Sequence, residues 1–383
     1  MKIFVTGTRG FPDVQGGVEK HCQELYPRLV KYGCEVTVAT RKPYISLNKR
    51  VRAWQGVSFV HLWCPKIKSL EAIIHTFLAV IVASMRSADI LHIHAVGPAL
   101  LTPLAKLLGL KVVLTTQGSD YARAKWGTFA KMVLRLGEFF GTKYADRVII
   151  VSNQIREQLE TKYKRTDLVL IPNGVTLPVL VPAGETLQRY GLEAKKYVFT
   201  ATRLVPEKGL HDLIGAYARI ENPEFKLVIG GGADHETPYS RQLKKMADET
   251  PGVILSGFVS GIPLGELYSN AGLFVLPSYH EGLSLALLEA ISYDLPVLVS
   301  DIPPNKEIPL PDYRFFPVGN VDILSRRMVE RFRAGITAQE KEDQTRILQT
   351  DYNWDTIAKE TYEVYKSVMK GKTGFSNDCH KAG

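Results

Sequence analysis

Cysteine is scarce in this sequence, and the few cysteines present are not spaced to bind a metal. The 383 residues include four cysteines, at Cys22, Cys34, Cys64 and Cys379. None belongs to a Cys-x-x-Cys pair, which excludes the usual cysteine-based zinc sites. So few thiols in a chain of this length fit a reducing compartment, and we expect structural or incidental roles for them.

Long hydrophobic runs are also missing. The most apolar stretch, Leu70 to Met85, has sixteen residues and includes Glu71 and His75. It is therefore too short and too polar for a membrane span and is predicted to be a buried helix. The sequence opens with the strand-like run Ile3-Phe4-Val5 rather than with a signal peptide, so we expect a cytoplasmic protein.

Paired metal-binding motifs are absent as well. No two aspartates are separated by a single residue, so the Asp-x-Asp pair that could hold a divalent cation is missing. His92 and His94 resemble half of a metal site, but no third ligand accompanies them. Buried positions at the end of a strand are the favoured interpretation of these two histidines, and no metal is expected.

The net charge of +9 is concentrated in the first half of the chain. Residues 1–172 hold 25 Lys and Arg against 12 Asp and Glu, whereas the remaining residues hold 23 against 27. One interpretation is a bias that only supports solubility. The other is attraction to an anionic partner, such as the cytoplasmic leaflet of a membrane or a lipid-linked phosphate. No nucleic-acid-binding module accompanies the charge, so nucleic acid is not expected as a partner.

Short apolar strands alternate with helices along the first half. Six runs rich in β-branched residues have the length of strands: Ile3 to Thr6, Glu35 to Ala39, Ser58 to Leu62, Ile90 to His94, Lys111 to Thr115 and Arg147 to Val151. Helical patterns lie between them, notably Val18 to Tyr32, Leu70 to Arg86 and Lys125 to Tyr144. Strands that are apolar throughout are typical of a parallel sheet covered on both faces.

A turn at Ile171 to Val175, with the sequence Ile-Pro-Asn-Gly-Val, interrupts this series. A second α/β series follows, with strands predicted at Tyr197 to Thr202, Lys226 to Gly230, Gly252 to Ser256, Leu273 to Pro277 and Pro296 to Ser300. We therefore predict an α/β fold of two doubly wound, Rossmann-like domains, residues 1–175 and 176–353, facing each other across a cleft. Residues 354–370 have an amphipathic helical pattern, and residues 371–383 are expected to be a frayed tail.

The most informative motif runs from His280 to Glu289 and follows a predicted strand. A loop that opens a helix presents backbone N–H groups to an anion, here from Gly282, Leu283 and Ser284, and the glycine allows close approach to a phosphate. Glu281 and Glu289 are eight residues apart, about 12 Å along a helix, which is the scale of an extended nucleotide sugar. The alternative is an acidic residue before a helix, favoured by the helix dipole, and one ordinary glutamate.

A second loop, Thr202 to Gly209, also follows a predicted strand and carries Arg203 and Lys208. Two cations on a tight, proline-containing loop can converge on a diphosphate and neutralise it as it departs. A solvated surface loop is the alternative.

A glycine-rich loop, Gly7 to Gly17, joins the first predicted strand to the first helix, as phosphate-binding loops do. Gly7 and Gly10 are separated by two residues, so the GxGxxG spacing is missing, which counts against a dinucleotide oxidoreductase. A flexible turn is the alternative here.

Together these motifs resemble those of the retaining glycosyltransferases of family 4, which have the two-domain GT-B fold. The resemblance covers about residues 1–370 and rests on motifs that occur in the family's order: Gly16-Gly17, Pro172-Asn173-Gly174-Val175, the loop with Arg203 and Lys208, and the pair Glu281 and Glu289.

The resemblance implies a retaining, metal-independent transfer in which the leaving phosphate accepts the proton of the acceptor. Arg203 and Lys208 would bind the donor diphosphate. Glu281 would bind the hydroxyls of the transferred sugar, and Glu289 the ribose. The backbone near Phe258-Val259 would meet the base, and Gly16 and Gly17 the phosphate and acceptor side. The last helix would cross back to the first domain.

One position departs from the family pattern. Relatives commonly carry His-Gly-x-Asp after the strand that ends near Thr115, whereas this chain has Gln117-Gly118-Ser119-Asp120. Gln117 can donate and accept hydrogen bonds but cannot titrate, so it can hold the donor sugar but cannot act as a general base. Asp120 would either serve the acceptor hydroxyl or cap a helix.

We therefore expect a transferase that moves a hexose from a nucleotide-diphosphate sugar to a saccharide or lipid-linked acceptor, in polysaccharide, glycolipid or capsule assembly. The basic amphipathic stretch Arg123 to Lys143 would lie on a membrane surface or pack as an ordinary helix with a solvated face. The same fold also supports a non-hydrolysing sugar-nucleotide epimerase, a sugar-phosphate synthase or a catalytically silent scaffold. The complete set of Arg203, Lys208, Glu281 and Glu289 argues against the scaffold.

Overall fold

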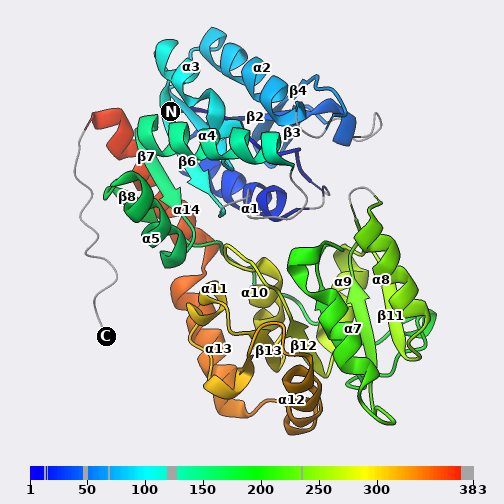
Figure 1. The fold of residues 1–383 in the computed structure, drawn as a ribbon. Coiled ribbons are helices and arrows are strands. Elements are labelled where there is room, and N and C mark those ends of the chain that lie inside the picture. The colour runs from blue at the N-terminus through cyan, green and yellow to red at the C-terminus, as the bar shows by residue number, and fades with distance from the viewer. Residues whose placement is uncertain are drawn as a thin grey trace. The chain divides into compact units, whose positions relative to one another are not determined.

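The computed structural model describes residues 1–12, 14, 16–45, 51–67, 70–118, 127–233 and 236–371, which form two compact units. The first unit comprises Met1–Asn173 and the segment that begins at Trp354, and the second comprises Gly174–Asn353. In Figure 1 the first unit runs from blue to green, with its C-terminal helix in red. Of the predicted frayed tail, only Gly371 lies among the described residues.

An eight-stranded sheet forms the centre of the first unit, in the order β3-β4-β2-β1-β5-β6-β7-β8. The strands are β1 (Lys2–Thr6), β2 (Glu35–Arg41), β3 (Ala53–Trp54), β4 (Val57–Leu62), β5 (Ile90–His94), β6 (Lys111–Thr116), β7 (Arg147–Ile150) and β8 (Leu168–Leu170). Their pairings are parallel, apart from the antiparallel pair of β3 and β4 at the edge. The central strands β1, β5 and β6 are buried along nearly their whole length, which fits the apolar runs Ile3-Phe4-Val5, Ile90-Leu91 and Val112-Val113-Leu114 within them.

Helices surround this sheet. They are α1 (Gly17–Lys31), η1 (Lys42–Tyr44), α2 (Glu71–Met85), η3 (Pro98–Leu101), α3 (Thr102–Leu107), α4 (Thr128–Tyr144), α5 (Asn153–Tyr163) and α14 (Trp354–Lys370). The C-terminal helix α14 packs on α1, where the Tyr32 and Tyr362 rings stack with centroids 5.2 Å apart and Arg28 Nε donates to Asp355 Oδ1 at 3.0 Å. Side chains of both helices join the core on β1 and β2. None of the helices in the described ranges is long and apolar enough to cross a membrane.

The second unit has a six-stranded parallel sheet in the order β11-β10-β9-β12-β13-β14. Its strands are β9 (Tyr197–Ala201), β10 (Lys226–Gly230), β11 (Val253–Gly257), β12 (Leu273–Leu276), β13 (Val297–Ser300) and β14 (Phe315–Phe316). Its helices are α6 (Glu185–Arg189), η5 (Pro206–Lys208), α7 (Leu210–Ala218), α8 (Pro238–Asp248), α9 (Gly261–Asn270), α10 (Leu285–Ser292), α11 (Pro303–Lys306), η6 (Asp312–Arg314), α12 (Val321–Ala334) and α13 (Ala338–Asp351).

Local sequence explains several of these helix ends. Thr237 begins α8 with a capping box completed by Ser240, and Thr337 begins α13 in the same way with Glu340. These reciprocal bonds satisfy backbone N–H groups that the first turn leaves unpaired. Glu340 also accepts from the buried guanidinium of Arg314 at 2.5 Å, which ties the start of α13 to the loop before β14.

The two doubly wound units confirm the predicted α/β fold. All eleven strands that the sequence predicts are present, within two residues at each end. Three strands were not predicted, β3, β8 and β14, because they have two or three residues each and are too short to show a periodicity. The predicted helix from Lys125 is observed from Thr128 on, and its first residues lie outside the described ranges. Cys22, Cys34 and Cys64 are buried and form no disulfide, and Cys379 lies outside the described residues.

Candidate functional site

In the second unit, the predicted site residues follow the two strands at which the strand order reverses. From β9 the chain continues to β10 on one side, and β12 pairs with the other side of β9. Open α/β sheets bind ligands outside the carboxyl ends of strands at such a reversal. The loop with Arg203 and Lys208 follows β9, and the loop with Glu281 follows β12. The topology therefore brings these three side chains to one edge of the sheet.

Lys208 and Glu281 form an ion pair at this edge. Lys208 Nζ lies 2.5 Å from Glu281 Oε1, and Ser278 Oγ donates to the same oxygen at 2.7 Å. The two charged side chains are only 15% and 7% exposed. Charge-assisted hydrogen bonds are the stronger class, so this contact fixes both groups. Sequence reasoning missed Ser278, whose place three residues before Glu281 was its only signal.

Backbone contacts hold the two loops together. Gly209 has φ +63°, and a Cβ atom at this position would lie 2.1 Å from the carbonyl oxygen of Pro277. Glycine therefore permits both the left-handed conformation and the close approach of the loops. The Tyr279 N–H also donates to the carbonyl of Glu207 at 2.9 Å. The spacing between Lys208 and Glu281 is thus set by the main chain as well as by the ion pair.

The loop after β12 ends at α10, with Ser284 as its N-cap. Ser284 Oγ accepts from the Leu287 N–H at 3.4 Å, and Gly282 and Leu283 lie before the helix. Glu289 lies within α10, as predicted, and its Oε2 accepts from the hydroxyl of Tyr268 at 3.2 Å. Burial and the charge of Glu289 raise the pKa of Tyr268 well above its usual value, so this phenol stays a donor.

Two other predicted residues of this unit lie at the same end of the sheet. Arg203 is half-buried beyond β9, in a segment where Thr202 N–H donates to Gly230 O at 2.8 Å. Val259 is half-buried between β11 and α9. All the predicted donor-binding residues of the second unit therefore follow the carboxyl ends of strands β9, β11 and β12.

The first unit has a corresponding reversal between β1 and β5. The glycine-rich loop follows β1, and a Cβ atom on Gly7 would lie 2.0 Å from the carbonyl oxygen of His94 at the end of β5. Gly16, with φ +149°, is the N-cap of α1, and a Cβ atom there would lie 2.0 Å from Glu19 Oε2. Arg9 donates its N–H and Nε–H to Glu19 Oε1 at 2.9 and 3.2 Å. Gly16 thus allows the first turn of α1 to fold closely over this loop.

Gln117, after β6, pairs with a residue of the turn that the sequence analysis singled out. Gln117 Nε2 donates to Asn173 Oδ1 at 3.2 Å, and Asn173 Nδ2 donates back to Gln117 Oε1 at 2.9 Å. The Nδ1 atom of His21 on α1 lies 2.8 Å from the same Asn173 oxygen. Sequence reasoning missed His21, because nothing in a helical pattern marks it. Asp120, the other predicted residue of this loop, lies outside the described residues.

His92 and His94 are buried at the end of β5, as their position in a strand predicts. His92 Nε2 lies 2.7 Å from Thr115 Oγ1, and the Tyr26 hydroxyl lies 3.0 Å from His92 Nδ1 and 2.5 Å from His94 Nε2. Burial lowers the pKa of His92 to about 3 and that of His94 well below its usual range. Within the described part of the chain, no cluster of three or more His, Cys, Asp and Glu side chains is arranged to hold a metal.

Two family models match the chain, one for each unit. The model described as "Glycosyltransferase Family 4" matches residues 15–177, and the model described as "Glycosyl transferases group 1" matches residues 185–346. The chain belongs to the family 4 glycosyltransferases. Solved structures show the same fold: sucrose-phosphate synthase of Thermosynechococcus elongatus, 21% identical, superposes with a TM-score of 0.82 over 97% of this chain and 100% of that one. The transferase therefore has the GT-B fold.

Curated sequences of other glycosyltransferases are also similar to this transferase. An uncharacterised glycosyltransferase of Methanocaldococcus jannaschii is 26% identical over 97% of this chain and 99% of its own length. The UDP-Gal:α-D-GlcNAc-diphosphoundecaprenol α-1,3-galactosyltransferase of Escherichia coli is 33% identical over 57% of this chain and 59% of its own length.

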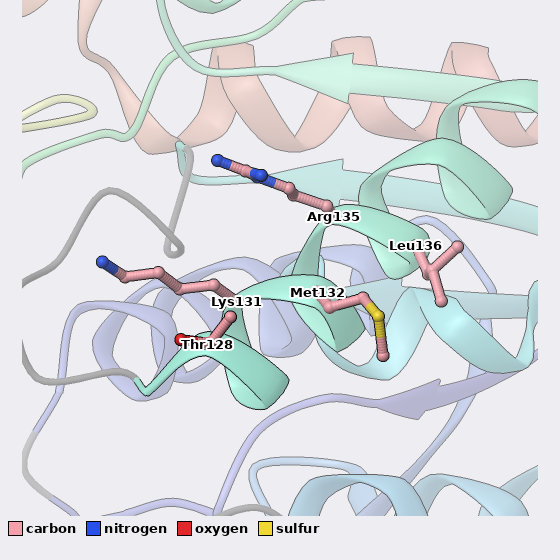
Figure 2. Close-up of a pocket in the computed structure, with 5 residues that line it drawn as sticks. All are labelled: Thr128, Lys131, Met132, Arg135 and Leu136. Atoms are coloured by element: carbon pink, nitrogen blue, oxygen red, sulfur yellow. The ribbon is translucent and has the colours of Figure 1, made fainter.

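A surface of the transferase distinct from these loops lies on α4. A cavity of about 410 Å³ is lined by Thr128, Lys131, Met132, Arg135 and Leu136 and contains none of the predicted site residues. Figure 2 shows the Lys131 and Arg135 side chains extending in one direction from the helix, with Met132 and Leu136 directed to the other side. Cationic and apolar side chains thus lie next to each other on the outer face of α4.

Proposed function

We propose that this glycosyltransferase is a retaining, metal-independent hexosyltransferase that uses a nucleotide-diphosphate sugar as donor. The acceptor is a saccharide or a lipid-linked saccharide, and the product belongs to polysaccharide, glycolipid or capsule assembly. The observation that carries the proposal is the buried Lys208–Glu281 pair, bonded to Ser278, where the strand order reverses. The E. coli relative, whose name gives a UDP-sugar donor and a diphosphoundecaprenol acceptor, supports the same substrate classes.

The donor consists of a sugar, a diphosphate and a nucleoside, and the second unit has residues suited to each of these parts. Arg203 and Lys208 bind the diphosphate, where hydrogen bonds to charged groups contribute about 1.5–3 kcal/mol each. The backbone N–H groups of Gly282, Leu283 and Ser284 add donors at the start of α10. Glu281 accepts from hydroxyls of the transferred sugar and Glu289 from those of the ribose, and the backbone at Val259 meets the base.

The transfer itself needs no separate protein nucleophile. The bond from the anomeric carbon to the diphosphate oxygen breaks, and a bond from the same face of that carbon to the acceptor oxygen forms. The proton of the acceptor hydroxyl passes to the departing phosphate oxygen. Arg203 and Lys208 neutralise the charge that develops on the diphosphate, which is the role that a divalent cation has in other transferases. Gln117 hydrogen-bonds the sugar, and Gly16, Gly17 and Asp120 serve the phosphate and acceptor side.

The first unit presents a surface suited to an anionic membrane, which would supply a lipid-linked acceptor. Helices α2, α3 and α4 contain two acidic side chains, Glu71 and Glu138, and both are buried in ion pairs. Their exposed large apolar side chains are Phe77, Met85, Leu107, Phe129, Met132, Leu136 and Tyr144. Lys131, Arg135 and Lys143 lie among these on α4. Amphipathic helices of this composition bind interfaces through apolar contact and attraction to anionic lipids.

Donor binding is the first test of the proposed activity. Thermal unfolding is followed with UDP-galactose, UDP-glucose and GDP-mannose in the presence of EDTA. We expect one donor to raise the melting temperature, and Glu281→Ala and Arg203→Ala to abolish the increase. Glu249→Ala, an exposed carboxylate on the same unit, is the control that keeps it. Stabilisation only when a divalent cation is added would contradict the metal-independent site.

Turnover of the same donor separates the reactions that this fold supports. We expect product formation with a lipid-linked saccharide. NMR of the product should show the same anomeric configuration as in the donor. Donor turnover without an acceptor would instead indicate an epimerase, and a soluble sugar phosphate as acceptor would indicate a synthase. With Arg203→Ala or Lys208→Ala, kcat/KM should fall about 10- to 100-fold, because each loses a charge-assisted hydrogen bond.

Vesicle binding tests the membrane surface. Co-sedimentation with vesicles of phosphatidylglycerol and phosphatidylcholine should exceed that with phosphatidylcholine alone. Each basic residue near an anionic surface contributes about 1 kcal/mol, so Lys131→Ala with Arg135→Ala should weaken binding about 25-fold. The matched control is Lys244→Ala with Lys245→Ala, a pair of exposed lysines on α8 of the second unit. Equal binding by both double variants would contradict this surface.

A further inference from the structure

The amide of Gln117 is held by a hydrogen-bonded group of three side chains. Gln117 and Asn173 exchange two hydrogen bonds, at 3.2 and 2.9 Å, and His21 Nδ1 lies 2.8 Å from Asn173 Oδ1. His21 and Asn173 are 3% and 1% exposed, so water does not compete for the bond between them, whereas Gln117 is half-buried. The rings of Trp354 and His21 pack in an edge-to-face arrangement with centroids 5.4 Å apart. The first residue of α14 thereby helps to fix the imidazole.

The tautomer of His21 sets the direction of the hydrogen bonds within this group of side chains. Burial lowers the pKa of His21 to about 4, so the ring is neutral near pH 7 and carries one N–H. Its Nε2 atom has no hydrogen-bond partner among the described residues. A buried N–H without a partner is rarer in proteins than an unused acceptor. The proton therefore lies on Nδ1, and His21 donates to Asn173 Oδ1.

The orientation of Gln117 follows from that of Asn173. Because Asn173 Oδ1 accepts from His21, Asn173 Nδ2 is the donor to Gln117 Oε1, and Gln117 Nε2 donates to Asn173 Oδ1. An amide nitrogen has two N–H groups. One points to Asn173, and the planar geometry directs the other away from it. Reversal of the pair would place the carbonyl oxygen of Gln117 there instead.

We propose that His21 and Asn173 are positioning residues, which hold the Gln117 amide so that its second N–H donates to an oxygen of the bound sugar. This inference rests on the proposed function, because it assigns a donor sugar to this transferase. It goes further in giving Gln117 one direction of hydrogen bonding and in naming the two residues that impose it. A hydroxyl oxygen that accepts from Gln117 is thereby a recognised feature of the sugar.

A double-mutant cycle tests the positioning role. The Kd values of UDP-galactose, UDP-glucose and GDP-mannose are measured by calorimetry for the wild-type chain, Gln117→Ala, Asn173→Ala and the double variant. We expect each single variant to weaken the bound donor about three- to tenfold, the range for one neutral hydrogen bond. The double variant should bind like Gln117→Ala alone, since Asn173 then has no amide to orient. Additive losses would overturn the proposal, and melting temperatures report stability separately.

His21 is tested by a pair of variants that differ in one donor. His21→Gln keeps a side-chain N–H, whereas His21→Phe fills the space without one. The donor Kd should stay near the wild-type value in the first and rise about twofold in the second, because the amide pair then populates both orientations. Equal Kd values for the two variants would overturn the role of His21.

Two further outcomes keep the proposals distinct. If Asn173→Ala does not fold, Gln117→Glu replaces it, because glutamate has the same size as glutamine but no side-chain N–H. An unchanged Kd of the donor in Gln117→Glu would overturn the proposal. If the wild-type chain binds none of the three nucleotide sugars, the proposed function itself fails, and the positioning role fails with it. Wild-type binding combined with additive losses overturns the positioning role alone.

Discussion

Mild acid should destabilise the first unit at a pH at which most carboxylates are still ionised. Burial lowers the pKa of His21 to about 4 and the pKa values of His75 and His92 to about 3, and it lowers the pKa of His94 well below its usual range. In the unfolded chain these side chains titrate near 6.5. Between about pH 6.5 and 4, the unfolded state therefore binds protons that the folded state excludes. The free energy of unfolding falls as the pH falls through this window.

The size of the effect depends on few assumptions. At pH 5 the folded pKa values of His21, His75 and His92, about 4, 3 and 3, lie below the pH, so the loss from these three depends on the unfolded pKa alone. Each of these three histidines then lowers the stability by about 2 kcal/mol relative to pH 7, and the three together by about 6 kcal/mol. Typical domains have a free energy of unfolding of about 5–15 kcal/mol. Carboxylates contribute little, because their unfolded pKa values are about 4.

Tryptophan fluorescence isolates the first unit in this experiment. All four tryptophans of the chain lie in residues assigned to it, as do the four histidines. Urea unfolding is followed at pH 7 and pH 5. His75→Leu should reduce the difference between the two free energies by about 2 kcal/mol. Val80→Ala, a buried residue of the same helix α2, should lower both values equally. Equal stability at the two pH values, or an unchanged difference in His75→Leu, would refute the desolvation argument.

Three further predictions concern the second unit. Gly209→Ala should lower the melting temperature more than Gly335→Ala, because both have φ near +63° but only the first Cβ meets a backbone oxygen, at 2.1 Å; equal shifts would contradict the tight loop contact. Tyr268→Phe should raise the Kd of UDP about three- to tenfold in calorimetry, since Glu289 loses a hydrogen bond that orients it. The pKa of Glu340 is lowered to about 2, with contributions from backbone and arginine hydrogen bonds, so its stabilisation is present above about pH 4.3 and is lost as the pH falls through 2. Glu340→Gln should therefore lower the urea midpoint at pH 7, monitored by circular dichroism.

The fold could be predicted from the sequence because its strong signals are local. Continuous apolar strands such as Leu273–Leu276 are recognisable by composition, and turns with Pro, Asn and Gly mark their ends. Strand order is not local. For example, β1 lies between β2 and β5. This order depends on how helices cover the sheet and cannot be recognised in any single run of residues. The shortest strands, such as Phe315–Phe316, exist only because a neighbouring strand is there to pair with them.

The candidate site was predictable to the extent that its side chains lie in motifs. Lys208 and Glu281 are 73 residues apart and meet at 2.5 Å, and only the family pattern linked them in the sequence. Ser278 and Tyr268, which bond to the two predicted glutamates, carry no motif. His21 faces inward from an ordinary helix. Supporting residues of this kind are defined by the side chain that they contact in the folded protein. They can therefore be identified only from the tertiary structure.

The two reversals of strand order differ in charge, and the difference matches what each would bind. In the second unit, a lysine and a glutamate meet beyond β9 and β12, with an arginine in the same loop. Fixed charges of this kind suit a diphosphate, whose own charge increases as the sugar leaves. In the first unit, the corresponding side chains His21, Gln117 and Asn173 are joined by hydrogen bonds between an imidazole and two amides. Burial keeps the imidazole uncharged near pH 7, so this group can recognise neutral hydroxyls by direction rather than by charge. Under the proposed function, the charged residues of the second unit serve the leaving diphosphate, and the neutral group of the first unit serves sugar oxygens.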